Sequence, residues 1–233
     1  MLTFLYLTGP CRRITLIMST DIEFYTRKAG EMLHKGQDED AVKNFYKALK
    51  HARKSTDTEA ICKCTLNLGA ALVALGRTSE GLKVLESAVP QEHDHLLSGD
   101  LSYNLCLAHE NLDDTAEAIK CIQKAIKCYS ECSDANAIVL KAGSACMLAF
   151  LHAELQELEE AAEAYADAAS SYSMANDVPQ QAVCLFEKAR MLGRCNKRVD
   201  AIAVADMCAK LCTEQPDAGV GKYKTDRTNS VVQ

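Results

Sequence analysis

The sequence has no tryptophan, only four prolines and 11 glycines in 233 residues, and 6% of its residues are aromatic. So few turn-forming and aromatic residues disfavour an all-β sandwich, which needs many short strands joined by tight turns. The low glycine and proline contents also exclude collagen-like and linker-like chains. A hydrophobic content of 48% and a formal net charge of −6 are those of a folded protein, so general disorder is excluded as well.

The sequence also lacks an uninterrupted apolar run of the roughly 18 residues needed to cross a bilayer. Its negative net charge disfavours nucleic acid as the main partner, because binding to phosphates requires a positive surface. We therefore expect no membrane and no nucleic-acid partner.

The N-terminal segment MLTFLYLTGPCRRITLIM is apolar, but its arginines follow the apolar part, which is the wrong order for a secretory signal. A second methionine, Met18, stands just before the first helix-start signal. We interpret residues 1–17 as an upstream extension from a non-primary start, or as part of an unstructured leader over residues 1–19. A mitochondrial presequence is the lesser alternative, because the segment contains few arginines.

Five segments of the chain repeat one pattern, in which an apolar helix and a short polar turn precede a second helix that opens around a small residue. Successive small residues are 40, 37, 43 and 40 positions apart. They are Ala41, Gly81, Ala118, Ala161 and Ala201. Another small residue follows seven positions later, with a larger residue between the two, as in Ala41, Phe45 and Ala48. Because positions i, i+4 and i+7 share one helix face, this pattern predicts close helix packing.

The repeated pattern predicts ten helices and no strand. Their expected ranges are 21–35, 38–54, 57–75, 78–89, 96–111, 115–130, 134–154, 157–174, 178–194 and 198–212. Three first helices of a pair begin with a capping box or a close relative of one, at Thr20, Thr56 and Asp177.

The second-helix pattern, preceded by Leu68-Gly69-x2-Leu72 in a first helix, resembles the tetratricopeptide repeat, which usually has about 34 residues. The longer spacing here is similar to the variant of about 40 residues found in cell-polarity adaptors. The resemblance implies an all-α, right-handed superhelical solenoid of about five antiparallel helix-turn-helix repeats. The repeat domain would span residues 20–213. Its repeats would lie near residues 21–54, 57–89, 96–130, 134–174 and 178–212.

The last expected helix differs from the polar capping helix with which solenoids usually end, because much of its surface is apolar. The chain is therefore interpreted as a fragment or isoform of a longer repeat protein, or as a module that associates with itself. Ile202 and Met207 are the candidate residues for self-association. Residues 214–233 are polar and contain glycine and proline, so we expect a disordered tail.

The 12 cysteines are the most unusual part of the composition. The close pairs are Cys62/Cys64, Cys128/Cys132 and Cys208/Cys212. None of these pairs has the Cys-x2-Cys spacing of a zinc knuckle, and all lie on expected helices. We therefore interpret the cysteines as small core residues, with a metal or redox site and disulfides as less favoured alternatives.

Catalytic motifs are absent from the sequence, which has no Gly-x-Ser-x-Gly, no phosphate loop and no Gly-x-Gly-x2-Gly before a helix. The sequence His93-Asp94-His95 could supply metal ligands only if its loop curled tightly, so a solvated loop is the favoured interpretation. We expect no catalytic residue, no metal site and no cofactor, and we expect that the protein is not an enzyme.

Partner binding is the function that the resemblance implies, because stacked helical hairpins line a concave groove with their first helices. On the family's groove positions the chain has two equivalent asparagines, whose amides could hold a peptide backbone. It also has an apolar patch that ends in two arginines. The candidate groove residues are Lys63, Asn67, Ala70, Tyr103, Asn104, Leu107, Met147, Phe150, Phe186, Arg190 and Arg194. Thr26 and Gly30 replace the basic and amide residues of the family's chaperone-tail clamp, so that clamp is not expected.

Two simpler explanations stay open for these groove residues. Asparagine is common at its position in the family, and the apolar patch could pack against a missing sixth repeat or the tail. The sequence nevertheless favours a cytoplasmic, non-catalytic adaptor or scaffold for a protein or peptide partner, since many free cysteines imply a reducing compartment. A homo-oligomeric structural module is the main alternative, and a thiol-based metal or redox protein is the lesser one.

Overall fold

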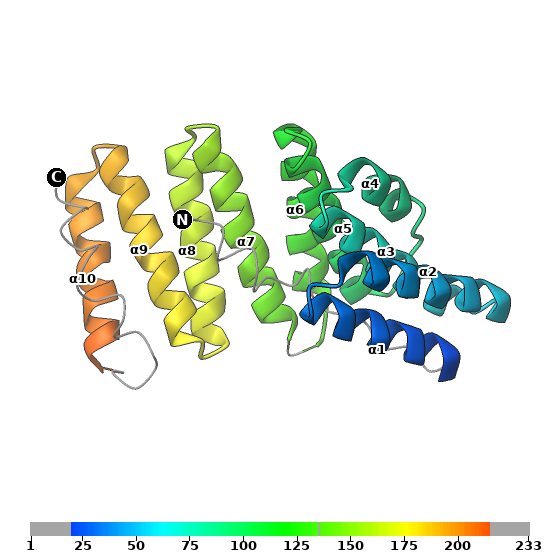
Figure 1. Ribbon diagram of the computed structural model, residues 1–233. Helices are drawn as coiled ribbons and strands as arrows, with labels where there is room; N and C mark the ends of the chain where they lie inside the picture. The colour runs from blue at the N-terminus through cyan, green and yellow to red at the C-terminus, as the bar shows by residue number, and fades with distance from the viewer. Residues whose placement is uncertain (1–19, 135, 215–233) are drawn as a thin grey trace. The chain divides into compact units, whose positions relative to one another are not determined.

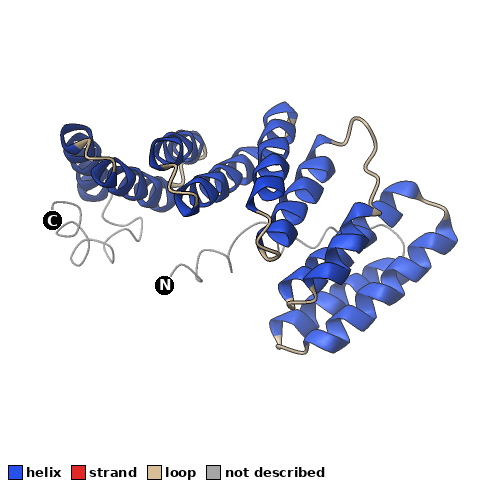
Figure 2. Ribbon diagram, turned by 90° about the horizontal axis from the view of Figure 1, so that it is seen from above, coloured by secondary structure: helices blue, strands red, loops and turns tan. Residues whose placement is uncertain are grey.

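The computed structural model describes residues 20–134 and 136–214, and every regular element in these ranges is an α-helix (Figure 1; Figure 2). The helices are α1 (Thr20–His34), α2 (Asp38–Ser55), α3 (Thr58–Ala74), α4 (Thr78–Glu86), α5 (His95–Glu110), α6 (Thr115–Glu131), α7 (Ala137–Glu154), α8 (Leu158–Met174), α9 (Val178–Arg194) and α10 (Arg198–Glu214). Each expected helix is present, and its ends lie within three residues of the predicted ones. The predicted leader over residues 1–19 and residues 215–233 of the predicted tail lie outside the described residues, whereas Glu214, which was predicted to belong to the tail, is the last residue of α10.

One backbone turn recurs between the two helices of every pair. A residue with positive φ follows the first helix, and the N–H of the next residue donates to the carbonyl oxygen five positions earlier. The positive-φ residues are Gly36, Gly76, Asp113, Gln156 and Asn196. This Schellman-type arrangement satisfies the last carbonyl groups of a helix. The repeat is therefore a property of the backbone as well as of the side-chain pattern.

The chain divides into two compact units, and the boundary between Cys128 and Tyr129 lies within α6. In the first unit α1 packs on α2 and α3 packs on α4, while α2 contacts α3 and α5 contacts both α3 and α4. In the second unit α7 packs on α8, α8 on α9 and α9 on α10. Each unit is therefore built from antiparallel helical hairpins, as Figure 1 shows.

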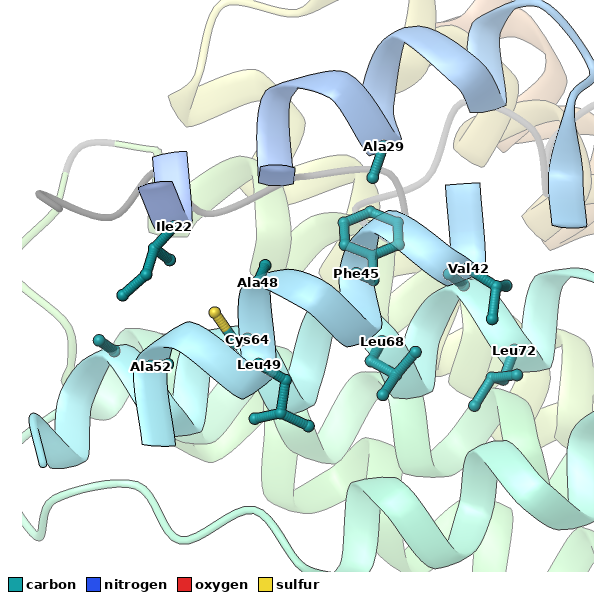
Figure 3. Close-up of a cluster of buried hydrophobic side chains, with 12 residues drawn as sticks. Ile22, Ala29, Val42, Phe45, Ala48, Leu49, Ala52, Cys64, Leu68 and Leu72 are labelled. Carbon is teal, nitrogen blue, oxygen red and sulfur yellow. The ribbon is translucent and has the colours of Figure 1, made fainter. Parts of the chain in front are cut away.

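The hydrophobic core of the first unit lies between α1, α2 and α3 (Figure 3). Phe45 of α2 packs there with Leu68 and Leu72 of α3, and Ala29 and Ala48 are the small residues beside them. The large residue between two small ones thus fills the space between helices, as the repeat pattern predicts.

The small residues that open the second helices lie at helix contacts. All five are buried: Ala41, Gly81, Ala118, Ala161 and Ala201. The contact is closest in the second pair, where a Cβ built on Gly81 would lie 2.7 Å from Cγ2 and 2.9 Å from the backbone nitrogen of Val73. A side chain at residue 81 would therefore collide with α3.

The largest departures from the predicted helices are in α4, which ends at Glu86 rather than at residue 89, and at the start of α7, which lies at Ala137 rather than at residue 134. Pro90 disfavours helical geometry in the residue before it and has no N–H to continue the helix. As a result α4 has nine residues, whereas α2 has 18. Residues 87–94 form the longest connection between the described helices.

The start of α3 corrects the predicted capping box at Thr56. Asp57 is the N-cap, because its Oδ1 accepts hydrogen bonds from the N–H groups of Glu59 at 3.0 Å and Ala60 at 3.1 Å. Thr56 instead ends α2 in the left-handed conformation, with a φ of 58°. The predicted cap of α9 is confirmed, since Asp177 accepts a hydrogen bond from the backbone N–H at position 180. The side chain of Thr20 lies outside the described part of the structure.

α7 is the described helix that is long and apolar enough, by length and composition alone, to cross a membrane. It packs along α8, and small residues such as Ala142 and Ala149 are buried. Core helices commonly have this composition, so the feature is weak support for a membrane span.

Candidate functional site

The turn residue with positive φ gives every first helix a common register for comparing groove positions. Asn67 stands nine residues before Gly76, and Asn104 stands nine residues before Asp113, so the two asparagines are equivalent. Both lie in the first unit, on α3 and on α5, and each is only 4% exposed. The predicted pair is therefore in register, and both amides are buried.

The amide of Asn104 forms a hydrogen bond inside its own helix. Its Nδ2 donates to the carbonyl oxygen of Asp100 at 2.7 Å. Asn44 of α2 makes the same bond to the carbonyl oxygen of Asp40, also at 2.7 Å. Such a bond fixes the amide against the helix. A peptide backbone at Asn104 would therefore have to pair with an amide of fixed orientation.

The other candidate groove residues of the first unit are poorly exposed. Ala70, Tyr103 and Leu107 are buried. Lys63 is half-buried, and its ammonium group pairs with the carboxylate of Glu59 one turn earlier on α3. The accessible part of the predicted groove in this unit is therefore small.

The candidate groove residues of the second unit are more accessible. Met147 is buried, but Phe150 of α7 and Phe186 of α9 are half-buried. The side chain of Arg190 is 43% exposed, and Arg194 is exposed. Phe186, Arg190 and Arg194 follow one another at intervals of four residues, so they lie along one face of α9. We call these three residues the α9 stripe.

The two arginines of the α9 stripe have different partners. Arg190 forms an ion pair with the largely buried carboxylate of Glu187, although neither Glu187 Oε2 nor Arg190 Nε has a partner in hydrogen-bonding geometry. Arg194 Nη2 donates to the amide oxygen of Gln156 at 2.8 Å. Because glutamine is neutral, the pair formed by Arg194 keeps its positive charge. The sequence places Glu187 among the groove positions of the last repeat, but its pairing with Arg190 was missed, although the i, i+3 spacing is the signal for such a pair.

A hollow of about 600 Å³ lies in the first unit beside the short helix α4. Its walls come from α3 and from the connection over residues 87–94, and they include Ile61, Cys62 and Val89. The second helices of the other pairs have 17 or 18 residues, so the early end of α4 accounts for the space. Sequence reasoning missed the hollow, although Pro90 was its signal.

The described cysteines are free thiols. Burial is the main cause that raises the pKa of Cys62 to about 11 and that of Cys64 to about 12, so both thiols stay protonated at neutral pH. Cys106, Cys184 and Cys212 are also buried. The predicted core role is less complete at six described positions that are only half-buried: Cys121, Cys128, Cys132, Cys146, Cys195 and Cys208. Among the side chains that the structure describes, no group of three or more His, Cys, Asp and Glu is placed to hold a metal ion.

Two histidines in equivalent positions each face a carboxylate across the turn of their own pair. His152 Nδ1 lies 2.6 Å from Glu157 Oε2, and His109 Nδ1 lies 3.6 Å from Asp114 Oδ2. Sequence reasoning missed both contacts. Their signal is an acidic residue directly after the positive-φ residue of the turn.

The sequence His93-Asp94-His95 is divided between a connection and a helix. His93 is exposed, whereas Asp94 is the N-cap of α5 and accepts a hydrogen bond from the Leu97 N–H at 2.9 Å. Helix capping is therefore the role that the structure shows for the central aspartate.

Helix α10 keeps large apolar side chains at its surface, as the sequence predicts. Ile202 is 52% exposed and Met207 is 58% exposed. Val199 is exposed as well, but the polar residues Asp206 and Lys210 lie on the same face by helical spacing. The exposed face is therefore mixed rather than purely apolar.

No protein-family model matches the chain. Among solved structures, BtubC (BKLC) from P. vanneervenii superposes with a TM-score of 0.70 over 84% of this chain and 82% of its own, at 13% sequence identity. A putative kinesin light chain from Podosopora anserina, with nearly identical TPR-like repeats, gives a TM-score of 0.68 over 86% of this chain and 100% of its own, at 15% identity.

A Rap protein, solved in complex with Competence and Sporulation Factor, gives a TM-score of 0.60 over 87% of this chain and 57% of its own, at 13% identity. Identities this low show a shared fold and nothing finer. The chain therefore has an all-α solenoid fold of TPR-like helical repeats, which confirms the predicted fold class.

Proposed function

We propose that the protein is a non-catalytic adaptor or scaffold that binds a protein or peptide partner on the first helices of its repeats. The observation that carries the proposal is the α9 stripe, where an aromatic ring and two guanidinium groups share one accessible helix face. Aromatic and arginine side chains commonly anchor binding partners, and a guanidinium group favours a carboxylate. The stripe therefore suits a partner segment with an apolar side chain beside an acidic one. The Rap protein solved with Competence and Sporulation Factor supports the use of this fold for binding.

The α9 stripe can be tested with a phage library of random peptides selected against the full chain. We expect enrichment of peptides that place an acidic residue next to an aromatic or aliphatic one. Arg194→Glu should weaken the best peptide about tenfold or more, because it replaces an attractive charge by a repulsive one. Fluorescence anisotropy with the labelled peptide measures the change.

Arg198→Glu is the matched control, since Arg198 is also exposed but lies on α10, outside the stripe. It makes the same change in net charge and should leave the affinity within about twofold. Equal losses in both variants would assign the effect to general electrostatics, and no loss in Arg194→Glu would exclude the α9 stripe as the binding face.

The two equivalent asparagines provide a separate test in the first unit. If Asn67 and Asn104 hold a partner backbone, the double change Asn67→Ala and Asn104→Ala weakens binding while the melting temperature stays the same. The melting temperature must be measured beside the affinity, because both amides are buried and Asn104 bonds to its own helix. A fall in stability without a change in affinity would assign both residues to the fold alone.

Self-association is the second candidate function, and the exposed Ile202 and Met207 of α10 favour it. Light scattering behind a sizing column would show a mass that rises with concentration, and the double change Ile202→Glu and Met207→Glu would abolish the rise. A parent chain that stays monomeric across the accessible concentrations rejects this alternative.

Two further parts of the proposal rest on the sequence. We place the protein in the cytoplasm, because its 12 cysteines suit a reducing compartment. We also propose, from the residues alone, that residues 67–88 and 102–119 resemble tetratricopeptide repeat protein 24, and we carry no mechanism over from that resemblance. Fractionation of cells that express a tagged chain would test the location, and a purely extracellular product would contradict it.

A further inference from the structure

Two cysteines on neighbouring first helices of the second unit lie close together. Cys146 belongs to α7 and Cys184 to α9, and their Sγ atoms are 3.3 Å apart. A disulfide bond is about 2.05 Å long, so the two sulfur atoms need to approach by only about 1.2 Å. Side-chain rotation and a small helix shift are enough for a movement of that size.

The two thiols differ in their access to solvent. Cys184 is 1% exposed, whereas Cys146 is half-buried, so a small oxidant reaches Cys146 first. The hydrogen bond with Cys146, together with burial, raises the pKa of the Cys184 thiol well above its ordinary value. Cys184 therefore keeps its proton at neutral pH and is the less reactive thiol of the pair until Cys146 has been oxidised.

Two phenol side chains of α8 lie beside the pair. Tyr165 and Tyr172 are both buried there, and burial is the main cause that raises the pKa of both phenols. The phenols stay neutral at physiological pH. The pair thus has one open approach through Cys146 and one buried partner, which is the usual arrangement of an attacked and a resolving cysteine.

We propose that Cys146 and Cys184 are an oxidisable dithiol that forms a reversible disulfide between α7 and α9 when the protein meets a hydroperoxide. The Cys146 thiolate attacks the peroxide oxygen, breaks the O–O bond and becomes a sulfenic acid. The leaving alkoxide or hydroxide takes up the proton that Cys146 released on ionisation and becomes an alcohol or water. The Cys184 sulfur then attacks the sulfenic sulfur and expels hydroxide, which takes the proton of Cys184 and leaves as water. Two thiols are oxidised and one peroxide is reduced, and a small thiol such as glutathione reverses the reaction by exchange.

The disulfide would tie together two helices that are otherwise connected through α8. It would close a loop between residues 38 positions apart in sequence. Loop closure restricts the unfolded chain, so the oxidised protein should melt about 5 °C or more above the reduced one. This expected rise in melting temperature distinguishes a disulfide between Cys146 and Cys184 from accidental oxidation of a surface cysteine.

The test treats the reduced full chain with a small excess of hydrogen peroxide, blocks the remaining thiols with N-ethylmaleimide and maps the digested peptides by mass spectrometry. We expect a cross-linked peptide that joins Cys146 to Cys184 and disappears on treatment with dithiothreitol. Cys184→Ser should abolish the cross-link and the rise in melting temperature. Cys208→Ser, a change at a half-buried thiol that donates to the Ala182 carbonyl oxygen, should leave both unchanged.

The peptide map of the parent chain decides the matter even if a variant fails to fold. Sulfinic acid at Cys146 without the cross-link overturns the proposal. A cross-link from Cys146 to a different cysteine does so as well. The proposal is also overturned if N-ethylmaleimide still alkylates both Cys146 and Cys184 completely after peroxide treatment that oxidises a free cysteine peptide.

Discussion

Gly69 of α3 and Gly81 of α4 bring their helices so close that a Cβ on Gly81 would lie 2.9 Å from the carbonyl oxygen of Gly69. Real Cβ atoms do not approach backbone oxygen so closely. This oxygen and the Val73 nitrogen, which would also lie 2.9 Å from the Cβ, belong to the main chain and cannot rotate away. The other repeats have alanine at the position of Gly81, so the second pair is the most tightly packed at this point.

Replacement of Gly81 by alanine should therefore destabilise the protein. Overpacking of a close contact costs about 1–3 kcal/mol, and the better helix propensity of alanine offsets at most about 1 kcal/mol of that cost. We expect a net loss of about 1–2 kcal/mol in urea unfolding followed by circular dichroism. Gly81→Val should lose more than Gly81→Ala, and equal stability of all three proteins would contradict the close contact.

The cap of α3 provides a second test. Asp57→Ala removes the acceptor for two N–H groups and should lower the free energy of unfolding by about 1 kcal/mol. Thr56→Gly is the matched control, because glycine adopts the left-handed conformation of residue 56 without steric cost. It should leave the stability unchanged or raise it slightly. A loss at Thr56 and none at Asp57 would restore the capping box that the sequence suggested.

A third expectation concerns pH and the carboxylate of Glu80. The hydroxyl of Tyr46 donates to Glu80 Oε1 at 2.8 Å, and this bond, followed by those from Arg77, lowers the pKa of Glu80. A folded-state pKa below the unfolded one means that ionised Glu80 stabilises the fold above the unfolded pKa. That contribution is lost as the pH falls through the folded pKa. Tyr46→Phe should therefore raise the pKa of Glu80 towards its ordinary value.

An NMR titration of the Glu80 carboxyl carbon measures this change directly. Tyr25→Phe is the control, because the Tyr25 ring packs against Phe24 and His51 in another part of the first unit. An unchanged Glu80 titration in Tyr46→Phe would show that the hydrogen bond does not form in solution.

Thiol reactivity supplies a fourth expectation. Burial is the main cause that raises the pKa of Cys62 to about 11 and of Cys64 to about 12, so few of these thiols are ionised at pH 8. Alkylation by iodoacetamide at that pH should modify Cys195, which is half-buried, many times faster than Cys64. Quantitative peptide mapping gives the rates. In guanidinium chloride the difference should vanish, and a fast reaction of Cys64 in the native protein would refute its burial.

The helices could be predicted from the sequence because their causes are local. The small, large and small residues of each second helix, as in Ala41, Phe45 and Ala48, follow directly from helix geometry. The end of α4 was also predictable from Pro90 and was missed only because the apolar pattern continues past Glu86. The cap of α3 shows a finer limit, since Thr56 and Asp57 are both common caps and only the backbone distinguishes them.

The candidate site was less predictable, because exposure depends on what packs against a helix and not on the helix itself. The register of Asn67 and Asn104 was right, yet nothing local indicates that both amides are buried. The closeness of Cys146 and Cys184 is harder still. The two cysteines stand at different distances from the positive-φ residues of their own turns, so the repeat pattern does not predict that they are neighbours.

The early end of α4 also determines where a protease is expected to cut the chain most easily. Proteases need an extended segment of several residues, and most connections in the described chain are too short to supply one. Residues 87–94 are the exception, and Val89 is 77% exposed while Gln91 and Glu92 are exposed too. A cut or an inserted tag near Gln91 falls between complete hairpins and breaks no helix, so this connection is the natural place to split the protein into two fragments or to attach a label.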